Sequence, residues 1–388
     1  MRTAIFIILQ FLFIDISTLH SQDSIRVTYY NLLDFPYLQQ DRIDTLKIIL
    51  DYLQPDIFVV NELTSFNGGA LIKNSALNTN GITHFSSAVF YDGPDTDNLL
   101  FYNDQIFGLK SQQQISTTLR DVSEYVLFYK SINLPTALDT TYLYFYSLHL
   151  KAGNDPSDAS RRKIEAETFK NFLSSNSRNK RLFVGGDFNF YSHTELACQE
   201  ILNSQNISLV DPINRMGDWH NNVGYQNYHT QSTRSVNGGY AGGASGGMDD
   251  RFDFIFVSSD VMNGSGGVQY VENSYSALGQ DGDHFNSAIN SGWNNAVPSN
   301  IASALFYMSD HLPVSLDFAI GGTIDVPIIE KPNWYVYYNS LLGKIYVDIM
   351  QDQGQLDMAI YDLRGRCVIK KKFTNKAHME LDLSNQLP

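Results

Sequence analysis

Short apolar segments alternate with an amphipathic segment in the first part of the chain, and this spacing predicts secondary structure. Residues 24–33 (SIRVTYYNLL) and 55–63 (PDIFVVNEL) are apolar runs of strand length. Residues 41–53 (DRIDTLKIILDYL), which lie between them, carry apolar side chains at helical spacing. Further strands are predicted at 124–129, 142–148, 181–184, 251–257 and 312–318. Strands that alternate with helices indicate two sheets packed face to face with helices outside.

A second helix is predicted at 159–176 (ASRRKIEAETFKNFLSSN), with Asp158 or Ser160 as its N-terminal cap. The triplet at 161–163 (RRK) is a basic cluster. We interpret it as the solvated face of this helix, because charged side chains at helical spacing usually face water.

Two polar regions interrupt the pattern of strands and helices. Residues 217–248 include the glycine-rich run SVNGGYAGGASGG, which predicts a mobile surface loop. Residues 279–295 carry Asp281, Asp283 and His284. The composition of this second region favours a solvated loop, with a metal site as the alternative.

The N-terminal residues 1–22 predict a secretory signal peptide, because a basic Arg2 precedes an apolar run and then small and polar residues. No later segment is long and apolar enough to predict a membrane span. The chain has 27 Lys and Arg against 41 Asp and Glu, a net charge of −14, which excludes a general electrostatic attraction for phosphate polymers. With only Cys198 and Cys367, we expect two independent buried thiols and no disulfide framework.

The character of the sequence changes near residue 321, where GGTIDVPIIEKP indicates a domain boundary. Short alternating strands follow in the segments WYVYY, KIYVDIM, LDMAIYDL, CVIKKKF and MELDL. These segments predict a small β-sandwich over residues 321–388, behind a larger α/β domain over residues 23–320.

Polar residues stand where the predicted strands of the larger domain begin or end. They are Asn31, Glu62, His149, Asp187, Asn189, Asp253, Asp310 and His311. Strand ends converge on the binding sites of layered α/β folds, so we expect these side chains to meet. In VGGDFNF, an extended backbone would project Asp187 and Asn189 to one face, where they would share a ligand.

The ordered set N…E…H…GDFN…D…SDH across residues 25–318 resembles the endonuclease/exonuclease/phosphatase superfamily of DNase I-like hydrolases, and GDFN followed by SDHLPV is specific for it. The resemblance implies a four-layered α/β/β/α sandwich. It also implies cleavage of phosphate esters with a divalent cation, usually Mg²⁺, with Mn²⁺ or Ca²⁺ as alternatives.

Phosphodiester hydrolysis needs a cation, an activated water and stabilisation of the departing oxygen. Because Mg²⁺ prefers oxygen ligands, Glu62 is the first metal-ligand candidate, assisted by Asn31 and Asp310. Asp187 would orient or deprotonate the water, and Asn189 would donate a hydrogen bond to the phosphate.

His311 would contact the phosphate from the opposite side. Asp253 would hold the ring of His311 in one tautomer. The sequence leaves open whether His311 or Asp187 accepts the proton from water. The resemblance places His149 near the phosphate or the leaving oxygen. Arg120 stands where DNase-like members have an arginine before a strand, with a surface charge as the alternative.

The tail has its own resemblance, carried by IYDLRGRCV and LDLSNQLP. It is similar to the C-terminal sorting domain of the type IX secretion system of Bacteroidetes-type bacteria. Such domains continue beyond LP with a glycine and an aromatic strand, whereas this chain stops at Pro388, so we expect the domain to be truncated. A generic β-sandwich accessory module is the alternative.

These features predict a secreted or cell-surface metal-dependent phosphodiesterase, most simply an extracellular DNase or RNase with nucleic acid as its substrate and the type IX machinery as a partner. A sphingomyelinase-like phospholipase C or a phosphatase on small phosphate esters is the first alternative. A catalytically silent adhesion module is the second, and the presence of every expected site residue disfavours it.

Overall fold

The computed structural model divides the chain into two compact units, Gln22–Ile324 and a second unit of Met1–Ser21 with Asp325–Pro388. The structure describes residues 8–9, 23–37, 42–130, 141–236, 242–320, 334–339, 344–349, 355–361, 367–374 and 378–382. The predicted signal peptide therefore lies outside the described residues, apart from the two residues of strand β1 (Ile8–Leu9). The predicted domain boundary around residues 321–332 lies outside them as well.

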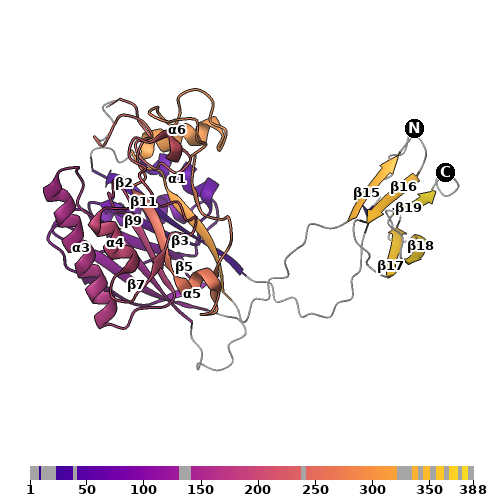
Figure 1. Cartoon of the computed structure of the whole chain (residues 1–388), viewed down its shortest axis with the longest axis horizontal. Helices are drawn as coiled ribbons and strands as arrows, with labels where there is room; N and C mark the ends of the chain where they lie inside the picture. The colour runs from indigo at the N-terminus through magenta and orange to yellow at the C-terminus, as the bar shows by residue number, and fades with distance from the viewer. Residues whose placement is uncertain are drawn as a thin grey trace. The chain divides into compact units, whose positions relative to one another are not determined.

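Two mixed sheets form the larger unit (Figure 1). The seven-stranded sheet has the order β12-β14-β2-β3-β5-β4, and β13 also pairs with β14. Its strands are β2 (Asp23–Phe35), β3 (Ile57–Leu63), β4 (Phe85–Ser87), β5 (Asp97–Asn103), β12 (Val268–Tyr270), β13 (Ser276–Ala277) and β14 (Val314–Ile320). The six-stranded sheet has the order β10-β11-β9-β8-β7-β6. Its strands are β6 (Phe107–Ile115), β7 (Val122–Tyr129), β8 (Tyr142–His149), β9 (Leu182–Asp187), β10 (Leu209–Val210) and β11 (Asp253–Ser258).

Each sheet contains one central parallel pair, β2 with β3 and β8 with β9. The strands next to these pairs, β14 beside β2 and β11 beside β9, run antiparallel to them. Strand β11 begins opposite Asp187 at the end of β9, and β14 begins opposite Tyr29 of β2. This arrangement brings the carboxyl ends of four strands and the amino ends of two others to one edge of the unit.

Aromatic side chains pack the two sheets face to face. The ring of Phe318 on β14 lies 4.6 Å from that of Phe183 on β9, which stacks on Phe145 of β8 at 5.0 Å. The hydroxyl of Tyr29 on β2 donates a hydrogen bond across the interface to the carbonyl of Phe183. Burial of several large rings, each worth about 1.5–3 kcal/mol, therefore holds the sheets together.

Helices cover the outer faces of both sheets. Helix α3 (Pro156–Ser175) packs Phe169 against Tyr146 of β8, and its neighbour α4 (Leu196–Asn203) completes that layer. On the other side, Arg42 of α1 (Arg42–Leu53) donates to carbonyls of β2 and of α6 (Ser299–Met308). The order helix, sheet, sheet, helix confirms the predicted four-layered architecture.

Shorter helical segments complete the larger unit, and the sequence pattern predicted none of them. They are α2 (Phe66–Leu71), the π-helix η1 (Ile72–Leu77), the 3₁₀-helix η2 (Val223–Tyr225) and α5 (Ser259–Asn263). Each is six residues or fewer, too short to show a clear apolar periodicity. Helices α4 and α6 and strands β4–β6, β10, β12 and β13 were also not predicted.

Helix α3 differs from its prediction at both its start and its charged face. It begins at Pro156 after the cap residue Asp155, because proline suits the first helical position, and not at Asp158 or Ser160. Arg162 is 1% exposed and forms an ion pair with Glu195, so the interpretation of residues 161–163 as a solvated face was wrong for its central member.

The region 217–248 was predicted as a mobile surface loop. The described residues of its glycine-rich run are mostly exposed, whereas several side chains that precede the run are buried. Trp219 is fully buried and Arg234 is 1% exposed. The guanidinium of Arg234 donates to the carbonyl oxygens of Gly242 and Phe306. Glycines give this segment backbone freedom, but buried side chains between them anchor it to the core.

The segment that carries Asp281 and His284 is also packed against the protein. The ring Nδ1 of His284 lies 2.8 Å from Asp281 Oδ1, and its Nε2 lies 3.2 Å from the carbonyl oxygen of Ser291. Asp281 Oδ2 accepts from the backbone N–H of Asn295. These contacts close the loop, so the predicted solvated loop was wrong for His284, which is 3% exposed.

The second unit contains two three-stranded sheets, β15-β16-β19 and β1-β17-β18. Its strands β15 (Trp334–Asn339), β16 (Lys344–Ile349), β17 (Gln355–Tyr361), β18 (Cys367–Thr374) and β19 (His378–Asp382) agree with the five predicted strands. Strand β1 pairs antiparallel with β17.

Cys198 is a buried free thiol, as expected for one of two independent cysteines.

Among the described residues, no helix combines the length and the apolar character needed to cross a bilayer.

Candidate active site

The predicted site residues gather where the central strands of both sheets end. In the ladder between β8 and β9, His149 is paired with Asp187, and in the ladder between β9 and β11, Asp187 is paired with Asp253. In the other sheet, Asn31 of β2 is paired with Asn61 of β3, next to Glu62. The register of the strands therefore brings these residues to one edge.

Glu62 reaches the site through an unusual backbone conformation. Asn31 and Asn61 both bond to residues of the opposite sheet, so a regular strand would turn the next side chain, Glu62, away from that sheet. Glu62 has instead a left-handed φ of 59°, and the pairing of β3 with β5 shifts register between Val60 and Leu63. This strained conformation lets Glu62 face the site.

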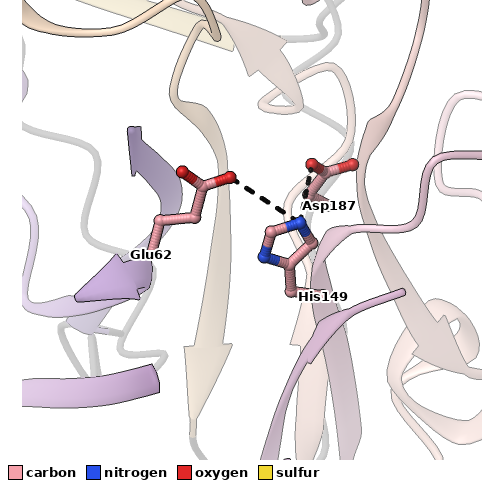
Figure 2. A group of neighbouring side chains, drawn as sticks. All are labelled: Glu62, His149 and Asp187. Carbon is pink, nitrogen blue, oxygen red and sulfur yellow. Dashed lines mark ion pairs between the residues drawn. The ribbon is translucent and has the colours of Figure 1, made fainter. Parts of the chain in front are cut away.

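Glu62, His149 and Asp187 form a cluster of metal-ligand type (Figure 2). Their ligand atoms all lie within 4.8 Å of one another, and no other such group of three occurs among the described residues. His149 Nε2 lies 3.7 Å from Glu62 Oε1 and 3.5 Å from Asp187 Oδ2. Both distances exceed hydrogen-bond length, so the three groups surround a common point without saturating one another.

Asn31 links the two carboxylates of this cluster. Its side-chain Nδ2 donates to Glu62 Oε1 at 2.9 Å and to Asp187 Oδ2 at 3.1 Å, and its oxygen accepts from the backbone N–H of Leu33. The other oxygen of Glu62 accepts from the backbone N–H of Asp34. Asn31 thus holds the carboxylates in place, while its amide oxygen is already engaged.

Burial shifts the pKa values of the cluster. It raises the pKa of Asp187 to about 7, with His311 opposing the shift and Asp253 and Glu62 adding to it. Burial also raises the pKa of Glu62, and the negative charge of Asp310 adds to this shift. Burial lowers the pKa of His149 well below its ordinary value, and the positive charge of Arg120 adds to the effect. The site therefore disfavours the ionised form of both carboxylates, and it favours the neutral form of the His149 imidazole.

These residues fit a divalent cation. A neutral imidazole presents a lone pair as a metal ligand, and the positive charge of a cation would compensate two carboxylates that burial otherwise forces toward protonation. The donor set, two carboxylate oxygens and one imidazole nitrogen, suits Mn²⁺ at least as well as Mg²⁺, which prefers oxygen ligands. Glu62, Asp187 and His149 would hold the ion.

His311 and Asp253 form a second functional pair beside Asp187. His311 Nδ1 lies 2.7 Å from Asp253 Oδ2, and its Nε2 lies 3.6 Å from Asp187 Oδ2. Burial acts to lower the pKa of His311, but the carboxylates of Asp253, Asp187 and Asp310 raise it well above its ordinary value. This imidazole is therefore oriented by one carboxylate and turns its other nitrogen toward the cluster.

Gln231 is a site residue that the sequence interpretation missed. Its Nε2 lies 2.6 Å from His311 Nε2 and 3.4 Å from Asp310 Oδ2. No sequence signal marked it, because it lies within the region 217–248 that was predicted as a mobile loop. Its main chain pairs with Asp250 and with His311 in isolated bridges.

Asp310 lies beside this cluster and not within it. Its Oδ2 accepts from the backbone N–H of Ala244 at 2.6 Å, and its Oδ1 is buried without a hydrogen-bond partner. The described end of the glycine-rich region thus packs directly on Asp310, where a Cβ on Gly243 would lie 2.9 Å from the carboxylate.

Asn189 occupies a position that differs from the simple expectation. Strand β9 ends at Asp187, and Asn189 has a left-handed φ of 52°, so the two side chains do not project from one extended strand. Instead, the backbone N–H of Asn189 donates to Asp187, and its side chain donates to the carbonyl of Leu150.

Arg120 forms an ion pair with Asp95 at 3.0 Å, and its positive charge lowers the pKa of His149.

The arrangement of these groups suits hydrolysis of a phosphate ester. Glu62, His149 and Asp187 offer a place for a cation, and His311 with Asp253 offers an oriented proton acceptor or donor next to it. Arg120 adds a positive charge near His149. A phosphate between these groups would meet positive charge on one side and a proton-transfer group on the other.

No family model matches this sequence, and no curated protein matches it. Solved structures match this chain at low identity. TDP2 from D. rerio, crystallised with a single-strand DNA product, is 14% identical and covers 76% of this chain and 99% of its own, with a TM-score of 0.49. An endonuclease/exonuclease/phosphatase family protein from Bacteroides thetaiotaomicron is 14% identical over 78% of this chain and 99% of its own, with a TM-score of 0.48.

A mannosyl-6-phosphatase from Bacteroides thetaiotaomicron is also similar. It is 14% identical over 76% of this chain and 99% of its own, with a TM-score of 0.46. Because these similarities are weak, the function proposed below depends on the geometry of the site.

Proposed function

We propose that the chain is a secreted, divalent-metal-dependent phosphodiesterase that hydrolyses nucleic acid outside the cell. One observation carries this proposal: Asp187 lies between a cluster of metal-ligand type and an oriented histidine. It is 3.5 Å from His149 Nε2 on one side and 3.6 Å from His311 Nε2 on the other. Such a pairing of a cation site with a proton-transfer group suits water attack on a phosphate ester.

The chain's own residues have distinct tasks in this proposal. A bound cation would neutralise charge on the phosphate oxygens. Asp187 and His311 flank the position from which water would attack. Asp187, whose pKa is raised to about 7, can take the proton of the water, and His311, whose pKa is raised well above its ordinary value, can donate one. Asp253 keeps Nδ1 of His311 engaged, so Nε2 is the nitrogen that faces the phosphate. Asn31 holds Glu62 and Asp187 in place through two hydrogen bonds.

The secreted location is proposed from the N-terminal sequence, and export through the type IX system is proposed from the tail. Both rest on residues that lie largely outside the described part of the chain. Extracellular nucleic acid is a polymer that an exported phosphodiesterase would encounter.

A phosphatase or phosphodiesterase on small phosphate esters is the second candidate, and the charges of the larger unit favour it. Three of its arginines, Arg42, Arg162 and Arg251, are buried and bonded within the protein. They cannot neutralise phosphates along a polymer, and the net charge of −14 opposes binding of a polyanion. A small ester would need few contacts beyond the metal and His311.

The test is hydrolysis by the purified mature chain with Mg²⁺ or Mn²⁺ and with EDTA. The substrates are supercoiled plasmid, bis(p-nitrophenyl) phosphate, p-nitrophenyl phosphate and choline-lipid vesicles. We expect metal-dependent nicking of plasmid that His311→Ala abolishes. His84→Ala, which changes a histidine whose ring stacks on Phe85, is the matched control and should retain activity.

The pattern of substrates decides between the candidates. Hydrolysis of small esters without nicking of plasmid would replace the nuclease with the second candidate, and hydrolysis of the vesicles alone would identify a phospholipase. If the folded, metal-loaded chain hydrolyses none of the four substrates, phosphoester hydrolysis itself is contradicted.

A further inference from the structure

A buried group of polar side chains joins the two sheets directly behind the candidate metal site. We call Asn61, Asn98, Ser123 and Ser147 the inter-sheet polar network. Asn61 is on β3 and Asn98 on β5 of the seven-stranded sheet, and Ser123 is on β7 and Ser147 on β8 of the six-stranded sheet. All four are 5% exposed or less. A polar group in such an apolar interface needs an explanation, because aromatic packing holds the sheets elsewhere.

Hydrogen bonds of this network cross from one sheet to the other. Asn61 Nδ2 donates to Asn98 Oδ1 at 2.6 Å and to Ser147 Oγ at 3.0 Å. Asn98 Nδ2 is 3.3 Å from both the carbonyl oxygen of Ser147 and the hydroxyl of Ser123. These directional bonds fix the relative position of the sheets at this edge more strictly than apolar contacts do.

The candidate metal ligands are divided between the same two sheets. Glu62 follows Asn61 on β3, whereas His149 lies two residues after Ser147 on β8 and Asp187 is its ladder partner on β9. The separation of Glu62 from His149 and Asp187 is therefore the separation of the sheets. The hydrogen bond between Asn61 and Ser147 therefore joins a neighbour in sequence of Glu62 to a neighbour in sequence of His149.

Asn61 also borders the strained residue that turns Glu62 into the site. Glu62 has a left-handed φ of 59°, which a non-glycine residue keeps only when its surroundings hold it. Asn61 is held by its two side-chain bonds, and a Cβ on the neighbouring Gly186 would lie 2.9 Å from Asn61 Oδ1. That oxygen is buried without a hydrogen-bond partner, which lowers the stability of the fold.

We propose that Asn61 is a positioning residue for the metal site: through its bonds to Ser147 and Asn98 it sets where the Glu62 carboxylate stands relative to His149 and Asp187. The inference rests on the proposed function, because it assumes that these three residues bind a divalent cation. It adds that the affinity for the cation is determined partly between the sheets, by residues that touch neither cation nor substrate.

The experiment measures binding of Mn²⁺ alone to the full chain, by the electron paramagnetic resonance of the free ion and without any substrate. Asn61→Leu keeps a side chain of similar size but removes the bonds, and Ser147→Ala removes the acceptor on the opposite sheet. We expect each to weaken Mn²⁺ binding about 10- to 100-fold, the range found when groups that orient metal ligands are removed.

Ser123→Ala is the matched control. Ser123 belongs to the same network and is equally buried, but it bonds to Asn98 and Gln114 and not to Asn61. We expect this variant to lower the melting temperature as the others do, while its Mn²⁺ affinity stays within about twofold of the wild type.

Two results would overturn the inference. One is wild-type Mn²⁺ affinity in folded Asn61→Leu, or in Ser147→Ala if the leucine variant does not fold. The other is an equal loss of affinity in Ser123→Ala, because a general loss of stability would then explain all three. Absence of Mn²⁺ binding by the wild-type chain is a different failure, since it would overturn the metal site of the proposed function itself.

Discussion

At the scale of single residues, the function of His311 depends on one carboxylate. Asp253 Oδ2 lies 2.7 Å from its Nδ1 and is itself buried, so this pair is shielded from water. The contact leaves Nε2 on the side of Gln231 and Asp187. Loss of the carboxylate would leave the ring free to adopt the other tautomer.

We predict that His311→Ala lowers kcat by about 10²–10⁴-fold, the usual contribution of a general acid or base. Asp253→Asn should lower it by about 10–100-fold, because the ring stays but its orientation is lost. The measurement is the steady-state rate on the substrate identified by the assays above. A rate for Asp253→Asn equal to that of the wild type would show that Asp253 does not act through His311.

The sequence made most of these residues recognisable, because each stands at a strand end in a short polar motif. It did not reveal Gln231, which lies in a glycine-containing region with no strand pattern. It also did not reveal the orientation of Glu62, since regular alternation would turn it away from the other sheet. The left-handed backbone at Glu62 exists only because the neighbouring strands hold it.

At the scale of elements, the end of β9 shows why VGGDFNF contains two glycines. A Cβ on Gly185 would lie 2.7 Å from the ring of Tyr29 on the facing sheet. Gly186 has a φ of +129°, and a Cβ there would lie 2.0 Å from the carbonyl oxygen of Leu148 on β8. The glycines allow close approach of β2 and β8 to the strand that carries Asp187.

We predict that Gly186→Ala lowers the free energy of unfolding by about 2–5 kcal/mol, because it combines a strained φ with a steric clash against backbone. Gly81→Ala is the matched control: its φ is +87°, but no atom lies within 4 Å of the added Cβ. It should cost about 1–2 kcal/mol. Both are measured by denaturant unfolding, and equal losses would contradict the role assigned to close packing at β9.

The contact of α3 with α4 and with the segment after α4 predicts a pH dependence of stability. Lys170 Nζ donates to the carbonyl oxygens of Ile201 and Ile207, and burial lowers the pKa of this lysine to about 8. The unfolded chain keeps the proton up to its ordinary value of about 10.5. Between these values the unfolded state binds more protons, so the contribution of Lys170 to stability rises with pH.

We predict that the free energy of unfolding of the wild type, minus that of Lys170→Met, increases from pH 8 to pH 10.5 and is flat between pH 6 and pH 7. The variant removes the titrating group and keeps a side chain of similar length. The measurement is urea unfolding of both proteins at several pH values. A difference that stays constant above pH 8 would contradict the lowered pKa.

At the scale of the whole larger unit, the candidate cation would join the two sheets. Glu62 belongs to the seven-stranded sheet, and His149 and Asp187 belong to the six-stranded sheet. A ligand that binds only the folded state stabilises it in proportion to the logarithm of its concentration. Metal binding and thermal stability should therefore be linked in this protein.

We predict that Mn²⁺ at about 100 times its dissociation constant raises the free energy of unfolding by about 2.7 kcal/mol, and that EDTA reverses the effect. Glu62→Gln should lose most of this stabilisation, whereas Glu272→Gln, which changes an exposed glutamate, should keep it. The melting temperature with and without Mn²⁺ is the measurement. Equal stabilisation of both variants would place the cation elsewhere.

The sequence by itself determined the class of the larger fold and most of the residues at its site. Apolar strands, one clear amphipathic helix and polar residues at strand ends are local patterns, and each follows from side-chain periodicity and hydration. The tertiary structure alone decided how these residues meet. The inter-sheet distance, the left-handed turn at Glu62, the burial of Arg162 and the position of Gln231 depend on contacts between segments far apart in the chain. No local pattern encodes such contacts, because they arise only when both sheets and their loops have packed.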